Sequence, residues 1–437
     1  MLVEPGVSTR GTIRRAPDRQ DFLAGADAYL DHVSRRLEGE PALQSIRWVE
    51  ALAEGHDIYR RTACLNLDPG EGVLSRRCRS LLKGDHGVRG ERRGSADDFR
   101  EELEATVVAM ARRLFGAGHA EWRAGGIASA RRAVLSALAR PQEVVVTLDG
   151  HAPDAAGPEH PRTLTLAPRR DFGPDLARLS QTVQRTRPQA IVVGGPDVAF
   201  ALPMVELRAI ADAAGAWLVY NADQLGVLVA AGDFQRPLEE GADAMIVATH
   251  GALGGPSGAL VMTNDPGLAA RLSAASAADA APDEGRYAAL AVALGEVQAF
   301  GCELGRRMAA NAQALAGALR AAGLPPLFAE RGYTSTHQLF LRAPGGADDA
   351  EARCGFANIR LAACALPGEG AGDPRTGLRL GVHELTRRGM GEAEMRQVAR
   401  IVAAAVLDEA DADRHISAVA DLLAPFATLP FSFDAAQ

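Results

Sequence analysis

Residues that could carry out acid–base or carboxylate-binding chemistry lie at three separate places in the chain. Glu71 stands in a Gly-Glu-Gly turn, His250 directly follows a short apolar run, and Arg379 stands within another apolar run. A carboxylate or an imidazole can move a proton, and a guanidinium can hold a carboxylate through two parallel hydrogen bonds. A lysine amine could form a Schiff base with an aldehyde, but Lys83 is the one lysine among the 47 basic residues. The chain therefore offers acid–base groups and very little capacity for lysine chemistry.

Metal and redox chemistry have little support. The five cysteines stand at positions 64, 78, 302, 354 and 364, and there is no CxxC, HxH or HExxH pattern. An odd, scattered set is typical of reduced thiols, so we expect a cytoplasmic protein without a metal site. The arginines at positions 89, 92 and 93 favour a solvated loop over a phosphate site.

Composition limits the classes of partner. The formal net charge is −8, which argues against nucleic acid or an anionic membrane as a partner. The start, Met1-Leu-Val-Glu-Pro-Gly6, has no basic segment followed by an apolar one, so we expect no signal peptide. We also expect no apolar run of membrane-spanning length. A hydrophobic content of 47% is enough for a sizeable core.

Short apolar runs alternate with helical segments through the middle of the chain. Such runs are typical of parallel strands buried on both faces, so we predict an α/β fold with a mainly parallel sheet. The predicted strands are 143–148, 190–194, 216–220, 244–248, 259–262, 337–341 and 377–380, and the predicted helices are 206–214, 286–322 (possibly broken) and 392–406. We expect an N-terminal arm and segment over 1–95, a large α/β domain over 96–325, and a small α+β domain over 326–437. The arm includes an amphipathic stretch at 22–37.

Five sequence blocks, in the same order along the chain, resemble serine hydroxymethyltransferases, which are fold-type I pyridoxal-phosphate enzymes. The blocks are Asn66-Leu-Asp-Pro-Gly-Glu-Gly-Val-Leu-Ser75, Ile191-Val-Val-Gly-Gly195, Leu207-Arg-Ala-Ile-Ala-Asp-Ala-Ala-Gly-Ala-Trp-Leu218 with Leu228-Val-Ala-Ala-Gly232, Thr249-His250 with Leu253 and Gly255-Pro256, and Gly377-Leu-Arg-Leu-Gly381 with Leu385-Thr-Arg-Arg-Gly389. The resemblance spans residues 60 to 400 in round numbers. It implies the family's fold and a dimer whose sites are built from two subunits, but a shared fold does not imply shared chemistry.

Most positions that the resemblance assigns to the cofactor carry other residue types here. The lysine that bonds pyridoxal phosphate falls on Gly251, the acid facing the ring nitrogen on Asn221, and a neighbouring histidine on Gln224. The phosphate cup falls on Ala124-Gly125-Gly126, which has no hydroxyl, and a further serine falls on Asp197. The other changed positions are Asp154 for the ring-stacking histidine (with His151 as a nearby alternative), Gly254 for an arginine after the lysine, and 84–94 for a tyrosine-rich segment. Independent cofactor contacts have therefore changed together.

Three groups still match the family pattern. Glu71 falls on the glutamate that handles protons on the substrate hydroxyl, Arg379 falls on the arginine that binds the substrate carboxylate, and His250 is retained. Structural alternatives are an intramolecular ion pair for Arg379 and a core histidine for His250. Asp223 would share the face of the ring-nitrogen position only if that strand end stays extended. Lys83 could reach the site, although a surface or anchoring role is its ordinary one.

Three functions stay open on the sequence. A pseudoenzyme would keep the scaffold as a homodimer, or as a heterodimer with an active paralogue to which Glu71 could be lent. An enzyme with altered chemistry would bind an amino acid or another carboxylate in the old pocket through Arg379 and Glu71, with Asp197, Asp223 and His250 as further polar groups. Residual pyridoxal chemistry would need the cofactor to enter already joined to an amino acid and to be held non-covalently. The coordinated changes favour the first hypothesis.

Overall fold

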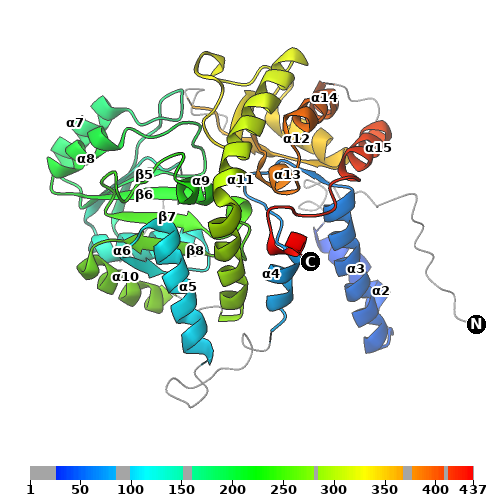
Figure 1. Cartoon of the computed structure of the whole chain (residues 1–437), viewed down its shortest axis with the longest axis horizontal. Helices are drawn as coiled ribbons and strands as arrows, with labels where there is room; N and C mark the ends of the chain where they lie inside the picture. The colour runs from blue at the N-terminus through cyan, green and yellow to red at the C-terminus, as the bar shows by residue number, and fades with distance from the viewer. Residues whose placement is uncertain are drawn as a thin grey trace, which may run out of the picture.

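The computed structural model of the chain describes residues 26–84, 99–150, 160–279, 284–367, 376–407 and 412–436. These residues form a seven-stranded sheet, a three-stranded sheet, a two-stranded ladder and an N-terminal helical arm (Figure 1). The structure is the mainly parallel α/β fold that the sequence predicts.

Five neighbouring strands of the large sheet run parallel. The strand order is β2-β8-β7-β6-β5-β3-β4, in which β8 is antiparallel to both of its neighbours. The strands are β2 (His119–Glu121), β3 (Val144–Thr147), β4 (Arg162–Thr165), β5 (Ala190–Gly194), β6 (Trp217–Asp223), β7 (Ala244–Ala248) and β8 (Ala259–Thr263). All five strands predicted here are present. The edge strands β2 and β4 were not predicted, because they are short and carry polar residues.

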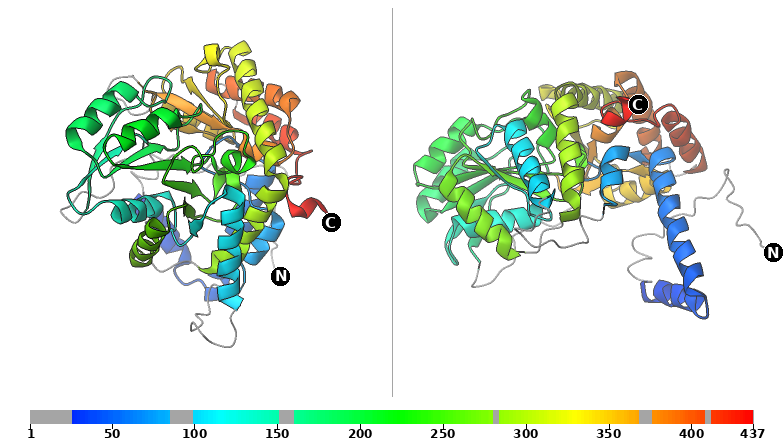
Figure 2. Two further views of the ribbon diagram at one scale, coloured as in Figure 1. Left: turned by 60° about the vertical axis from the view of Figure 1, so that its left-hand side comes forward. Right: turned by 60° about the horizontal axis from the view of Figure 1, so that its bottom comes forward.

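Helices cover both faces of this sheet, because successive strand residues point to opposite sides. Val145 and Val219 pack with one set of helices, whereas Val146 and Leu218 pack with the other. The first set is α6 (Ile127–Leu138) and α10 (Pro266–Asp279), and the second is α5 (Phe99–Phe115), α7 (Leu176–Thr186), α8 (Met204–Asp212), α9 (Gly226–Ala231) and α11 (Tyr287–Ala321) (Figure 2). The predicted helix at 206–214 corresponds to α8.

The long helix predicted over 286–322 is unbroken. It is α11, which has 35 residues, is buried at many points from Tyr287 to Leu319, and packs against both α5 and α14 (Glu392–Leu407). By length and composition it is the one helix in the described ranges that could cross a membrane, so the expectation that no run reaches this length is wrong. Within its most apolar window, 56% is buried inside the protein, as in the core helix of a globular protein.

The C-terminal elements surround a small antiparallel sheet. Its order is β11-β12-β9, formed by β9 (Gln338–Arg342), β11 (Ala362–Cys364) and β12 (Gly377–Gly381). A second core joins this sheet to α12 (Ala347–Phe356), α14 and α15 (Ala412–Leu423), while the short helix α13 (His383–Arg387) follows β12. The predicted strands 337–341 and 377–380 and the predicted helix 392–406 are therefore all present. The strand β1 (Leu65–Asn66) pairs in parallel with β10 (Ile359–Arg360), which anchors the segment that leads to Glu71.

Two helices project from the body as an arm. They are α2 (Ala26–Leu37) and α3 (Ala42–Thr62), which extend away from the sheets in the right-hand view of Figure 2. None of the 21 residues of α3 is buried. Its large apolar side chains, between 44% and 63% exposed, are Leu43, Ile46, Trp48, Val49, Leu52 and Ile58. The arm therefore presents an apolar surface that the described part of the chain leaves exposed.

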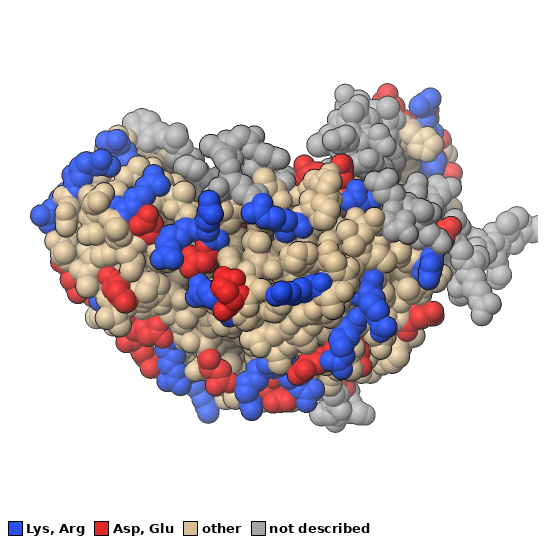
Figure 3. All heavy atoms as spheres, turned by 90° about the horizontal axis from the view of Figure 1, so that it is seen from above, with Lys and Arg blue, Asp and Glu red and all other residues tan. Residues whose placement is uncertain are grey.

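Charges are mixed on the face seen from above. Basic and acidic side chains are interspersed there (Figure 3). Together with the net charge of −8, this distribution does not favour an anionic partner on that face.

Candidate functional site

The predicted site residues come from segments that follow three parallel strands and meet two segments from outside the large sheet. Asp197 follows β5, Gln224 follows β6 and Gly251 follows β7. Because parallel strands end at the same edge of a sheet, the three residues come to the same edge. From the other side, Arg379 of β12 pairs with Asp197. A Cβ added at Gly72 would lie 2.2 Å from the carbonyl oxygen of Gly251, so the segment that carries Glu71 packs directly on this turn.

Gly251 has a backbone conformation that favours glycine. Its φ is +63°, in the left-handed region that side chains rarely adopt. A Cβ built here would lie 2.0 Å from Oε1 of Gln224. The Gln224 side chain is buried, and its Nε2 donates to Asp223 Oδ1 at 3.1 Å. The place where a lysine would begin is filled by another side chain.

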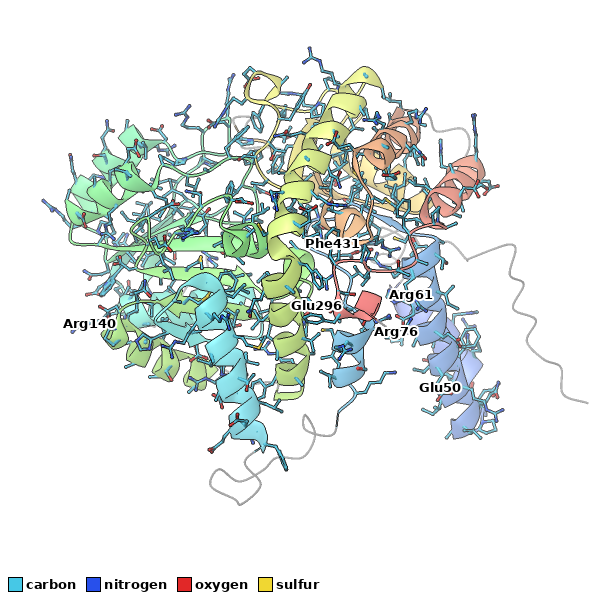
Figure 4. All side chains as sticks on the ribbon, in the orientation of Figure 1. Glu50, Arg61, Arg76, Arg140, Glu296 and Phe431 are labelled. Atoms are coloured by element: carbon cyan, nitrogen blue, oxygen red, sulfur yellow. The ribbon has the colours of Figure 1, made fainter. Side chains whose placement is uncertain are left out.

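Gly254 has a similar relation to Arg387. A Cβ added at Gly254, whose φ is +73°, would lie 2.1 Å from Nη1 of Arg387. Arg387 Nη2 donates to Glu296 Oε2 at 2.5 Å, and both side chains are almost fully buried. Glu296 lies on α11, beside the C-terminal segment that carries Phe431 (Figure 4). A guanidinium is therefore present next to this turn, but α13 supplies it.

Asn221 belongs to a buried polar chain. Its Nδ2 donates to Asp149 Oδ2 at 3.2 Å, and Asp149 pairs with Arg131 of α6 at 2.8 Å. All three side chains are at most 3% exposed. The amide is thus engaged by the Asp149 carboxylate, which Arg131 balances.

Asp223 does not share the face of Asn221. The ladder pairs Asn221 with Ile246 and Asp223 with Val247, so β6 bulges between them. Asp223 also has φ +34°, which is not an extended conformation. The condition for a shared face is therefore not met, because the strand end is bent.

The predicted phosphate cup leads into the start of α6. The amide of Gly126 donates to Ser129 Oγ at 3.1 Å, and this hydroxyl donates back to the Gly126 carbonyl at 3.0 Å. A Cβ added at Gly125 would lie 4.0 Å from the same Ser129 Oγ. The carbonyl of Ala124 accepts from the buried Arg286 at 2.7 Å. Internal groups hold much of this segment.

Arg379 is in an intramolecular ion pair. Its Nη1 donates to Asp197 Oδ1 at 2.9 Å and to the carbonyl of Pro196 at 3.2 Å. Its Nε is buried and has no hydrogen-bond partner within the described part of the chain. Asp197, a new carboxylate relative to the family pattern, thus lies on the predicted carboxylate-binding group.

Both carboxylate oxygens of Glu71 pair with arginines. One carboxylate oxygen pairs with Arg60 of α3 and the other with Arg360 at 3.0 Å. Its backbone carbonyl oxygen contacts Nε2 of His383. The side chain is thus neutralised on both oxygens.

Two buried histidines, His337 and His383, lie near Arg379 and Glu71, respectively. The rings of His337 and His383 have centroids 5.2 Å apart. Burial lowers the pKa of His383, and burial, with His383 and Arg379 adding to it, holds the pKa of His337 well below its ordinary value. Both nitrogens of His337, like Nδ1 of His250, have no hydrogen-bond partner among the described residues.

The remaining predicted residues are elsewhere. Lys83 is exposed in the turn after α4 (Arg76–Leu81). His151, Asp154 and the arginines at 89, 92 and 93 lie outside the described residues. No disulfide joins any of the five cysteines, and no group of metal ligands is found within the described ranges.

Sequence reasoning missed several residues that shape the site. They are Arg131, Asp149, His337, His383 and Arg387. Partners far away in sequence explain this, since 91 positions separate Arg387 from Glu296. The available signal was charge inside apolar blocks, as in Leu385-Thr-Arg-Arg-Gly389.

Comparison with known proteins places the chain in a family. A family model described as serine hydroxymethyltransferase matches residues 169–402. An α-methylserine aldolase from Ralstonia sp is 30% identical over 427 residues, covering 93% of this chain and 97% of that protein. A serine hydroxymethyltransferase from Korarchaeum cryptofilum is 31% identical over 398 residues, covering 83% of this chain and 92% of that protein.

The fold agrees with a solved structure. The crystal structure of L-threonine transaldolase from Pseudomonas fluorescens, in its internal aldimine state, matches with a TM-score of 0.82 and 23% identity, over 93% of this chain and 97% of that one. The fold is thus that of fold-type I proteins. The chain belongs to the serine hydroxymethyltransferase family.

Proposed function

We propose that this chain does not hold pyridoxal phosphate on a lysine, does not perform serine–glycine one-carbon transfer, and acts as a pseudoenzyme that serves as a partner subunit. The observation that carries the proposal is the turn at Gly251, where a left-handed glycine lies against the side chain of Gln224. An aldehyde needs an amine at this position, and glycine offers none.

The groups around the turn do not fit the cofactor either. Asn221 is neutral and is engaged by Asp149, so the residue that would face the ring nitrogen carries no charge. The hydroxyl of Ser129 is turned onto Gly126. Arg379 and Glu71, two of the three groups that match the family pattern, both have internal ionic partners. Each change supports the same reading, so we derive no step through the cofactor.

A second candidate is an enzyme, or a binding protein, that takes an amino acid or another carboxylate through Arg379 and Glu71. Buried polar atoms without a described partner favour it, namely Arg379 Nε and both nitrogens of His337. Such atoms are costly unless water or a ligand meets them. The names of the relatives describe enzymes, which also supports retained chemistry. It ranks second because Asp197 already lies on Arg379.

We further propose that the protein is cytoplasmic and that the arm, α2 and α3, makes a dimer with a second copy or with an active paralogue. The exposed apolar residues of α3 support this, since a soluble monomer rarely leaves such a surface uncovered. The tripartite division into 1–95, 96–325 and 326–437 belongs to the same proposal, with the arm as the part that reaches outward.

Reconstitution with pyridoxal phosphate tests the proposal. The protein is mixed with the cofactor, alone and with glycine or L-serine, while visible absorbance and melting temperature are recorded. We expect no Schiff-base absorbance and no stabilisation. The matched control is Lys83→Arg, which removes the one lysine, so any absorbance it abolishes comes from Lys83. Stoichiometric absorbance with the cofactor alone, together with turnover of L-serine, would overturn the proposal.

A gain-of-function series sharpens this test. Gly251→Lys alone should stay without stoichiometric cofactor, because the new side chain meets Gln224 and the backbone is strained. Gly251→Lys with Gln224→Ala removes the steric part, and Gln224→Ala alone is the control. Full covalent loading of the single variant would contradict the reading that this turn is closed to lysine.

A further inference from the structure

One contact joins the two sheets at the heart of the site. Asp197 follows β5 of the large sheet and Arg379 lies on β12 of the small one, and their charged groups meet at 2.9 Å. The side chains are 28% and 15% exposed, so the pair is partly shielded from water. Shielding strengthens an ion pair relative to one on the open surface.

We propose that Asp197 acts as a tethered carboxylate that occupies Arg379 and keeps small carboxylates out of the site. The inference rests on the proposed absence of the lysine-bound cofactor, because it treats Arg379 as a non-covalent binding group. The Asp197 oxygen takes one donor of the guanidinium, and its charge opposes the approach of a second carboxylate. The chain would therefore regulate its own site by an internal ligand.

The donors beside this pair are not all satisfied. In the β9–β12 ladder, Arg379 is opposite Phe340, so Arg379, Phe340 and Gln338 share one face of the small sheet. Phe340 packs on Phe172 of the large-sheet side, which shows where that face points. Gln338 is fully buried there, and neither of its amide atoms has a hydrogen-bond partner among the described residues.

These unmet groups match the chemistry of a small carboxylate. Arg379 Nε and Gln338 Nε2 are donors without described acceptors, and a carboxylate offers two acceptor oxygens. The described contact between the Asp197 carboxylate and the guanidinium is made to Nη1. The site thus resembles a carboxylate-binding site. The carboxylate of Asp197 occupies Nη1 of Arg379, while the donors Arg379 Nε and Gln338 Nε2 have no described acceptor.

The size of the effect follows from competition. While Asp197 holds Arg379, an external carboxylate cannot bind there. The apparent affinity for the external carboxylate is therefore reduced in proportion to the fraction of molecules in which Arg379 is free. A hydrogen bond to a charged group corresponds to a factor of about ten to a hundred. Removal of the Asp197 charge should therefore tighten carboxylate binding by about that factor.

Calorimetric titration with L-serine, in the absence of pyridoxal phosphate, tests the inference on the full chain. Asp197→Ser should bind L-serine and acetate about tenfold or more tightly than the unchanged protein does. Ethanolamine, which has the amine but no carboxylate, should show no gain. Arg379→Ala added to Asp197→Ser should abolish the gain.

Controls keep each outcome informative. Asp171→Ser removes a comparable pair, Asp171–Arg331 at 2.8 Å, and should leave L-serine binding unchanged. Asp197→Asn keeps the shape and serves where Asp197→Ser lowers the melting temperature. Equal binding by the unchanged protein and the Asp197 variants, or no carboxylate binding by folded Asp197 variants, would overturn the inference. Neither result bears on the lysine position, which the absorbance test with pyridoxal phosphate decides separately.

Discussion

The turn at residues 249–258 and the arm formed by α2 and α3 differ in how closely the rest of the chain packs on them. At the turn, Gln224 occupies the space beside Gly251, and Arg387 occupies the space beside Gly254. On the arm, no residue of α3 is buried and its large apolar side chains face outward. Side chains of the same chain thus occupy the space beside the turn, whereas the large apolar side chains of α3 are exposed. The comparison favours a molecule that works by association more than by chemistry at the old site.

The largest effect should come from the ion pair that supports the turn. Arg387→Ala would leave Glu296 buried without its cation, and we expect a loss of about 3–5 kcal/mol in the free energy of unfolding. Urea unfolding measures it. The matched control is Arg307→Ala on α11, the helix of Glu296, which breaks an exposed pair with Glu303 at 2.7 Å and should cost under about 1 kcal/mol. Equal costs for the two variants would mean that the pair does not support the turn.

The arm should dominate association. Leu52→Asp places a charge on its exposed apolar surface, so dimerisation should weaken by about 2 kcal/mol or more, roughly thirtyfold in Kd. Sedimentation or light scattering across a dilution series measures this. Val205→Asp, at another exposed apolar residue with 78% exposure, is the control and should leave the dimer intact. A monomer at all concentrations, or a dimer unaffected by Leu52→Asp, would contradict the role of the arm.

Gly251→Ala should cost about 1–3 kcal/mol of unfolding free energy, from backbone strain and from contact with Gln224. Gly332→Ala separates the two causes, because Gly332 has a similar φ of +75° and no described atom within 4 Å of an added Cβ. The excess cost at Gly251 measures the packing of Gln224, and Gln224→Ala should remove it. If Gly251→Ala costs no more than Gly332→Ala, the turn is not filled.

The smallest effect should be a pH dependence from the buried histidines. The folded-state pKa of His337 and His383 is lowered, so both bind protons more readily in the unfolded chain. Stability should therefore be fully present above the ordinary histidine pKa of about 6.5 and fall as the pH drops below it. Urea midpoints at several pH values measure this slope. His337→Gln should flatten it, whereas His32→Gln on the exposed arm should not; identical slopes for all three proteins would contradict this assignment.

The strands that lead to this site could be predicted from the sequence, whereas most of its side-chain contacts could not. Apolar runs predicted the strands at 216–220 and 244–248, which lead to Asn221 and Gly251, because burial on both faces leaves a continuous apolar signal. The bulge before Asp223 was not predictable, since it depends on how β6 meets β7. Arg387 could not be paired with Glu296 from sequence, because a helix 91 residues away supplies the partner. The filling of Gly251 by Gln224 likewise depends on tertiary packing.

The most direct test of the central claim is borohydride reduction followed by intact mass measurement. The full-length protein is incubated with pyridoxal phosphate, reduced, and weighed beside Lys83→Arg. We predict no stoichiometric adduct on either protein, because Gly251 carries no amine and Lys83 is a solvent-exposed residue in the turn after α4. A stoichiometric adduct on the unchanged protein that is lost in Lys83→Arg, with L-serine releasing the cofactor before reduction, would contradict the account and assign the cofactor to Lys83.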